Sequence, residues 1–178
     1  MNIFALYPSP QESARAHCDA HLHKMILESA QIISSAFYLR SWQRPWMYKP
    51  THLNHPCVKW AAECNHNIVW ILDLARELED IRQELGHPYH ASTEVIKYAY
   101  DFLQDELPYV RSDLAYPRIC AMPLGIRARS DISTEEKYQT YYREKNKAWT
   151  VLDKRPMTWK NRPVPSFMVT ETTNHANT

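Results

Sequence analysis

The stretch from Ala14 to Phe37 limits the fold of this chain more narrowly than any other part of the sequence. Its apolar residues recur at helical spacing and form one continuous stripe, made of Cys18, Leu22, Met25, Ile26, Ala30, Ile33 and Phe37. At about 100° per residue, this stripe is as wide as the buried face of a helix that packs on a core. We therefore predict one long helix, which Ser9 or Ser13 caps and which ends near Arg40.

The opposite side of the same predicted helix carries polar side chains that could do chemistry. The residues that fall within a sector of about 60° on the helical wheel are His17, His21, Lys24 and Glu28. A carboxylate beside basic groups favours acid–base chemistry or the stabilisation of a cation at a sugar carbon. The alternative, from the residues alone, is that Glu28 only pairs with Lys24 on a solvated helix face.

Three more helices are expected from the same period, and prolines separate them. They cover about residues 56–85, 94–107 and 134 to 149 or 152. Asn54 can cap the first of these and Gly86 can end it. Ser133 and Glu136 form a capping box at the start of the last helix. The segments between the helices are rich in proline and are predicted to be loops.

The composition indicates one class of fold and argues against two motifs that bind nucleotides. The 178 residues suit one domain, and no segment alternates as a strand does. We expect an all-α fold, a compact single-domain helical bundle over residues 1–168 with long proline-rich loops, followed by a flexible tail at 169–178. The two glycines exclude a P-loop and a dinucleotide fingerprint.

Neither a membrane protein nor a metalloprotein is expected. No apolar run reaches the roughly 18 residues that span a bilayer, and the N-terminus lacks the regions of a secretory signal. The four cysteines form no CxxC pair, which favours reduced, buried thiols in a cytoplasmic protein. His17 and His21 are spaced to share a metal, but no second pair of ligands has recognisable spacing, so we expect no metal and no cofactor.

Basic residues concentrate near the end of the chain. From Arg127 to Arg162 they outnumber the acidic residues and alternate with tyrosines and tryptophans. This composition is typical of a surface that binds phosphates and stacks on bases. The alternative is a solvated helix whose aromatic side chains face the core, and the composition alone does not decide between the two.

Four segments of the chain, taken in order, form a recognisable pattern. They are the N-terminal MNI, the run DAHLHKMILE, the block from Asn54 to Gly86, and the run REKNKAWTVLDKRPMTWK. With them, the chain resembles the phage pyrimidine-dimer DNA glycosylases of the endonuclease V type. It is also similar to a set of mostly uncharacterised phage proteins that open with NIF and continue through HCD to KMILE.

The resemblance implies an endonuclease V-like fold and a DNA glycosylase with AP-lyase activity. In that family the N-terminal amine attacks C1′ of a flipped nucleotide and forms an imine. Carried over to this chain, the amine belongs to Met1, the assisting carboxylate to Glu28 and the neighbouring histidine to His21. Lys24 joins them on the polar helix face. A Met1 nitrogen within about 4 Å of the Glu28 carboxylate would support this mechanism, whereas a separation beyond about 8 Å would count against it.

The resemblance also implies a partner and a binding surface. The partner is double-stranded DNA, bound by a monomer in the cytoplasm, or in the host cytoplasm if a phage encodes the protein. The residues expected to contact DNA are His17, Arg143, Lys147, Arg155, Trp159 and Lys160.

Two departures from the family leave alternatives open. Leu27 stands where the family has arginine directly before the glutamate, and a retained methionine replaces a small terminal residue. One alternative is a phage transferase that modifies a flipped pyrimidine, with His21, Lys24 and Glu28 as acid–base or binding groups. The other is a non-catalytic DNA-binding protein on the same scaffold.

Overall fold

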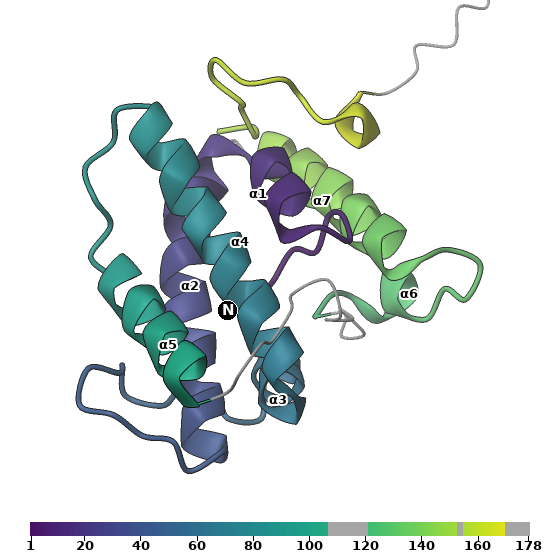
Figure 1. The fold of residues 1–178 in the computed structure, drawn as a ribbon. Coiled ribbons are helices and arrows are strands. Elements are labelled where there is room, and N and C mark those ends of the chain that lie inside the picture. Colours follow the sequence, from purple (N-terminus) through teal and green to yellow (C-terminus); the bar gives the residue numbers. More distant parts are fainter. Residues whose placement is uncertain (107–120, 153–154, 170–178) are drawn as a thin grey trace, which may run out of the picture.

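Helices form all the regular structure of the residues that the computed structural model describes, which are 1–106, 121–152 and 155–169 (Figure 1). No strand occurs in these ranges, so the predicted all-α class is confirmed. The elements are α1 (Pro10–Ala16), α2 (Asp19–Leu39), α3 (Pro56–Glu63), α4 (Asn65–Glu84), α5 (Thr93–Glu106), α6 (Leu124–Arg127), α7 (Thr134–Val151) and the 3-10 turn η2 (Ser166–Met168).

The predicted apolar stripe forms the buried face of α2. All seven of its residues, from Cys18 to Phe37, are buried. α2 packs against α3, α4 and α5, and α4 also contacts α1 (Figure 1). Ile68, Ile71 and Leu78 of α4 are fully buried at this junction. None of the helices in the described ranges is long and apolar enough to cross a bilayer.

The first predicted helix is wrong in one respect, because the chain breaks it into α1 and α2. His17 and Cys18 have extended backbone, with ψ of 138° and 163°. The Cys18 amide donates to the Tyr142 hydroxyl at 2.9 Å, and the Asp19 amide donates to the Thr158 carbonyl at 2.8 Å. These amides have partners outside the helix, so the chain can turn between α1 and α2 without leaving them unsatisfied.

The predicted helix over 56–85 is also divided, into α3 and α4. Cys64 between them is extended, with φ of −155° and ψ of 163°. The His55 side chain caps α3 by accepting from the Cys57 amide, in place of the predicted Asn54. Gly86 has φ of +76° and accounts for the predicted end of the long helix.

The later part of the chain follows the prediction more closely. α5 and α7 have nearly the expected bounds, and the capping box of Ser133 and Glu136 is present in both directions. The segment before α7 was predicted to be a loop, but it contains α6. Residues 108–120 of that segment and the tail from 170 lie outside the described residues.

The first eight residues have no regular structure and run through the core. Ile3, Phe4, Ala5 and Leu6 are buried. The Leu6 carbonyl accepts from Gln139 of α7 at 2.8 Å. This buried course brings the terminal residue to the middle of α2, where the N-terminus is marked in Figure 1.

Candidate functional site

Three nitrogen groups lie close to the carboxylate of Glu28, which is in the middle of α2. Its Oε2 accepts the backbone N–H of Asn2 at 2.8 Å. Its Oε1 lies 3.9 Å from the α-amine of Met1 and 3.3 Å from the Lys24 ammonium. Glu28 is only 9% exposed, whereas the Lys24 side chain is 58% exposed. The Met1 nitrogen therefore lies within the distance of about 4 Å from the Glu28 carboxylate that was set out above.

These groups open into a pocket of about 220 Å³. Its lining comprises Met1, Asn2, Phe4, His21, Lys24, Glu28, Ala121, Tyr141 and Lys145. The structure therefore brings together all four residues that were predicted to be catalytic. Three amines, from Met1, Lys24 and Lys145, face one carboxylate, so the pocket favours an anionic or oxygen-rich ligand.

Sequence reasoning missed five members of this pocket, which are Asn2, Phe4, Ala121, Tyr141 and Lys145. Tyr141 and Lys145 lie four residues apart on α7, which is the spacing of one helix face. The spacing could have predicted that the two side chains lie on the same face of a helix. It could not have predicted which other part of the fold that face packs against. Asn2 gave no signal, because its role depends on contacts far along the chain.

Asn2 anchors the terminal residue to three parts of the fold. Its backbone binds Glu28 of α2, and its side-chain Nδ2 donates to the Ala121 carbonyl at 2.9 Å. Its Oδ1 accepts from the Ile3 amide at 2.7 Å and from the Cys57 thiol at 3.7 Å. The α-amine is thus fixed by the residue that follows it.

His21 is a buried member of the pocket lining. Its Nδ1 lies 2.6 Å from the Tyr142 hydroxyl, and its ring stacks on Phe4 with centroids 4.9 Å apart. Burial lowers the pKa of His21 to about 2, with further lowering by the charges of His17, Lys145 and Lys24. The imidazole is therefore neutral at ordinary pH, and it does not lie on an exposed polar face as predicted.

His17 does not belong to a DNA-binding surface, which corrects the prediction. It is 0% exposed, and its Nδ1 donates to the Ser13 carbonyl at 2.6 Å. Burial lowers its pKa to about 4. The break between α1 and α2 causes the error, because the helical wheel that aligned His17 with Glu28 assumed one unbroken helix.

Trp159 is a second correction. It is 8% exposed, and its indole N–H donates to the Ala16 carbonyl at 3.0 Å, so it packs in the core. Tyr138 and Tyr142 of α7 are also buried. These three aromatic side chains therefore face the core, which was the alternative to a base-stacking surface, and they are not available to stack on bases.

The other predicted DNA contacts differ in exposure. Arg143 is half-buried and donates to the Phe167 carbonyl at 3.1 Å and to Thr140 at 3.0 Å, so it holds η2 against α7. Lys147, Arg155 and Lys160 are exposed. These three remain available to phosphates.

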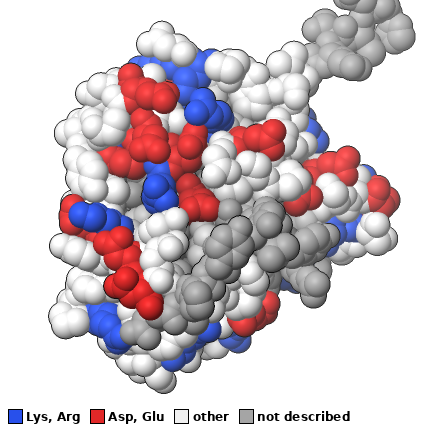
Figure 2. All heavy atoms as spheres, in the orientation of Figure 1, with Lys and Arg blue, Asp and Glu red and all other residues white. Residues whose placement is uncertain are grey.

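A different face of the molecule is acidic. Asp73, Glu77 and Asp80 lie along one side of α4, and acidic side chains gather there in Figure 2. Phosphates are repelled from such a surface.

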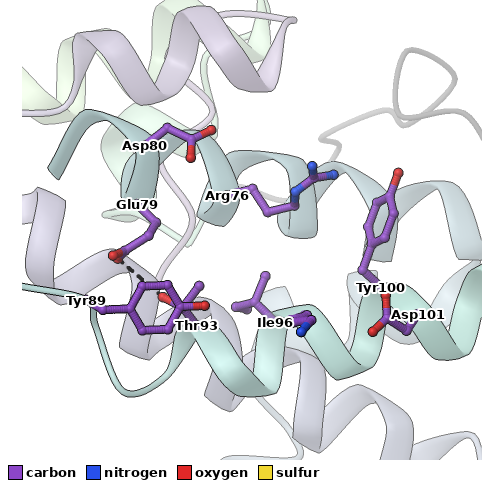
Figure 3. A pocket seen from close by; sticks show the side chains of 9 residues that line it. Arg76, Glu79, Asp80, Tyr89, Thr93, Ile96, Tyr100 and Asp101 are labelled. Atoms are coloured by element: carbon purple, nitrogen blue, oxygen red, sulfur yellow. Dashed lines mark hydrogen bonds between the residues drawn. The ribbon is translucent and has the colours of Figure 1, made fainter. Parts of the chain in front are cut away.

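A larger pocket of about 380 Å³ lies between α4 and α5 (Figure 3). Arg76, Glu79 and Tyr89 contribute to its lining, and it contains none of the predicted site residues. The Glu79 carboxylate in its wall already accepts from Arg82, Gln83, Thr93 and the His90 amide. We favour the smaller pocket as the functional site because it holds an amine beside a carboxylate.

The described residues contain no group of three or more His, Cys, Asp or Glu side chains arranged to hold a metal ion. Cys18 and Cys57 are free and buried, Cys64 is free and half-buried, and Cys120 lies outside the described residues. Burial raises the pKa of the Cys57 thiol to about 12, which keeps it protonated beside the site.

Comparison of the chain with models of known protein families, with curated proteins and with solved structures gives no match. A functional assignment therefore depends on the pocket and on the residues that form it.

Proposed function

We propose that this protein is a DNA glycosylase with AP-lyase activity, acting on a damaged or modified pyrimidine in duplex DNA. The observation that carries the proposal is the α-amine of Met1, 3.9 Å from the Glu28 carboxylate in a pocket with two lysines. The resemblance to the endonuclease V type of glycosylase supports the same chemistry.

The reaction starts with an unprotonated α-amine, because the nucleophile needs its lone pair. The amine nitrogen forms a bond to C1′, and the bond between C1′ and the base breaks with its electron pair leaving on the base, which takes up the proton that the amine releases. The nitrogen lone pair then forms the C1′=N bond of the iminium while the C1′–O4′ bond breaks, and O4′ takes up a proton as the sugar ring opens. Glu28 stabilises the cationic sugar and the iminium that follows. It then accepts a proton from C2′ while the C3′–O bond breaks, which is β-elimination. Water hydrolyses the iminium and frees the amine.

Borohydride trapping tests this proposal directly. Duplex DNA with one abasic site is expected to give a covalent adduct, which mass spectrometry maps to the peptide containing Met1. Intact mass first establishes that Met1 is present with a free amine. The absence of an adduct with both abasic and dimer-containing duplexes would exclude imine chemistry.

Glu28→Gln is the matching variant. Loss of the carboxylate is expected to lower the trapping rate by about 10²-fold or more, the scale of a lost general acid–base group. Glu84→Gln, an exposed position at the end of α4, is the control and is expected to trap as the natural protein does.

A second candidate function is favoured by Lys24. Its ammonium lies 3.3 Å from Glu28 Oε1, and no step of the imine mechanism is assigned to it. A transferase that modifies a flipped pyrimidine could use this lysine as a binding or acid–base group. Mass spectrometry of nucleosides from phage DNA, with and without the gene, decides: unchanged nucleosides would exclude modification.

A non-catalytic DNA-binding protein predicts a different result. It would bind duplex DNA with strong salt dependence, and Glu28→Gln with a blocked N-terminus would bind equally well. In that case Glu28 serves only to fasten the N-terminal segment.

A further inference from the structure

The hydroxyl of Tyr142 lies in the core between a backbone amide and an imidazole. It accepts a hydrogen bond from the Cys18 amide at 2.9 Å, and it lies 2.6 Å from His21 Nδ1. Burial raises the pKa of Tyr142 well above its ordinary value, so the hydroxyl keeps its proton. An amide N–H offers no lone pair, and the Cys18 thiol that also lies beside the hydroxyl is a weak acceptor. The proton therefore goes to His21 Nδ1.

We propose that Tyr142 is a positioning residue that fixes His21 as the neutral tautomer with its proton on Nε2, and that His21 uses this N–H to bind a substrate oxygen in the Glu28 pocket. The substrate part rests on the proposed function. The tautomer part concerns the free protein and stands independently of it.

The packing of the imidazole supports this orientation. Phe4 stacks on one face of the His21 ring, and Trp149 meets it edge-on with centroids 5.4 Å apart. Nδ1 faces Tyr142, so the part of the ring left to line the pocket is the part away from Tyr142.

The charges around His21 agree with a neutral donor. Burial and the charges of Lys24 and Lys145 disfavour a positive imidazolium. The Met1 amine and Glu28 line the same pocket. A neutral imidazole with a fixed N–H adds a donor without adding repulsion between cations. Together with Lys24 and Lys145 it suits an oxygen that carries negative charge, such as a phosphate oxygen next to the abasic sugar.

Nitrogen NMR of the ¹⁵N-labelled full chain tests the tautomer. Two-bond proton–nitrogen correlations, assigned with His21→Gln, are expected to show Nδ1 unprotonated and Nε2 protonated. This pattern should persist between about pH 8 and about pH 5. A proton on Nδ1, or an imidazolium of His21 within that range, would overturn the proposal.

Tyr142→Phe removes the donor, and Tyr138→Phe is the matched control one turn earlier on α7. In Tyr142→Phe, the Nε2–H form of His21 is expected to lose its dominance, and trapping on abasic DNA to slow by about tenfold or more. Tyr138→Phe should change neither the His21 nitrogens nor the rate. An unchanged tautomer in folded Tyr142→Phe would overturn the role of Tyr142.

Substitutions of His21 keep the proposal testable even if Tyr142→Phe does not fold. The amide nitrogen of Gln reaches the place of Nε2, so His21→Gln is expected to trap within about tenfold of the natural rate, whereas His21→Ala loses about 10²-fold. Equal losses in both variants would overturn the donor role. If the natural protein forms no adduct at all, the proposed function fails, while the nitrogen spectra still decide the tautomer.

Discussion

Asn2 decides where the α-amine lies, because Met1 has no anchor comparable to the hydrogen bonds of the residue after it. The Asn2 amide binds Glu28, and its side chain joins Ala121 and the Cys57 thiol. These contacts connect the terminus to α2, to α3 and to the residue that precedes the turn into α6.

Asn2→Leu is therefore expected to impair the site without removing any reacting group. A loosened terminus lowers the trapping rate by about tenfold or more, because catalysis is sensitive to small displacements. Leucine is chosen since a small residue at this position promotes removal of Met1. Borohydride trapping with intact-mass control measures the effect, and Asn54→Leu, at an exposed loop position, is the comparison. Equal rates in the two variants would contradict the anchoring role.

Glu79 and Arg82 join two helices and the turn between them. Arg82 donates to Glu79 at 2.6 Å, to the Pro88 carbonyl at 2.9 Å and to His23 Nδ1 at 3.0 Å. Glu79 also accepts from Thr93 at the start of α5. Both side chains are about 5% exposed or less. This buried pair fixes the turn between α4 and α5.

Glu79→Gln leaves the Arg82 charge buried without its carboxylate. We expect the free energy of unfolding to fall by about 3 kcal/mol, the scale for breaking a buried ion pair. Urea denaturation followed by circular dichroism measures it. Glu84→Gln, exposed on the same helix, should change stability by no more than about 0.5 kcal/mol. A Glu79→Gln value as small as this would show that the pair does not hold the turn.

The elements themselves show which features of the fold were predictable. The stripe of α2, the end at Gly86 and the capping box at Ser133 follow from short-range patterns, and all three are confirmed. The break at His17 and Cys18 depends on Tyr142 and Thr158, more than 120 residues away. No local pattern carries that information. For the same reason Trp159 was predicted as a DNA contact, although it packs on Ala16.

The candidate site was predictable to a similar extent. Lys24 and Glu28 lie four residues apart on one helix, and their ion pair follows from that spacing. The resemblance supplied Met1. Lys145 and Tyr141 come from α7, and their place in the pocket depends on how α7 packs against α2 and the N-terminal segment. This packing is a property of the whole fold.

Across the whole molecule, two buried histidines make stability depend on pH. Burial lowers the pKa of His17 to about 4 and that of His21 to about 2, from an ordinary 6.5. The unfolded chain therefore binds more protons than the folded chain below pH 6.5, so acid destabilises the fold. We expect the free energy of unfolding to fall by a few kcal/mol between about pH 6.5 and about pH 4.

His17→Asn tests this dependence. The asparagine amide can replace the Nδ1–H donor to the Ser13 carbonyl, but it does not titrate. Denaturation at a series of pH values is expected to give a shallower slope for the variant than for the natural protein. Asn54→Leu, at an exposed position, removes no titrating group and should leave the slope unchanged. If the natural protein is equally stable at pH 4 and pH 6.5, folding does not lower the pKa of these two histidines and the expectation is wrong.

The buried N-terminal segment also sets the order in which the protein can form. Its hydrogen bonds reach Ala121 and Gln139, 119 and 133 residues later in the chain. At ribosomal rates, α7 emerges on the order of ten seconds after Met1. Throughout that interval the α-amine is open to the enzymes that process nascent chains, and afterwards it is held against Glu28. Any chemical change to Met1 is therefore made most readily while the chain is still being synthesised.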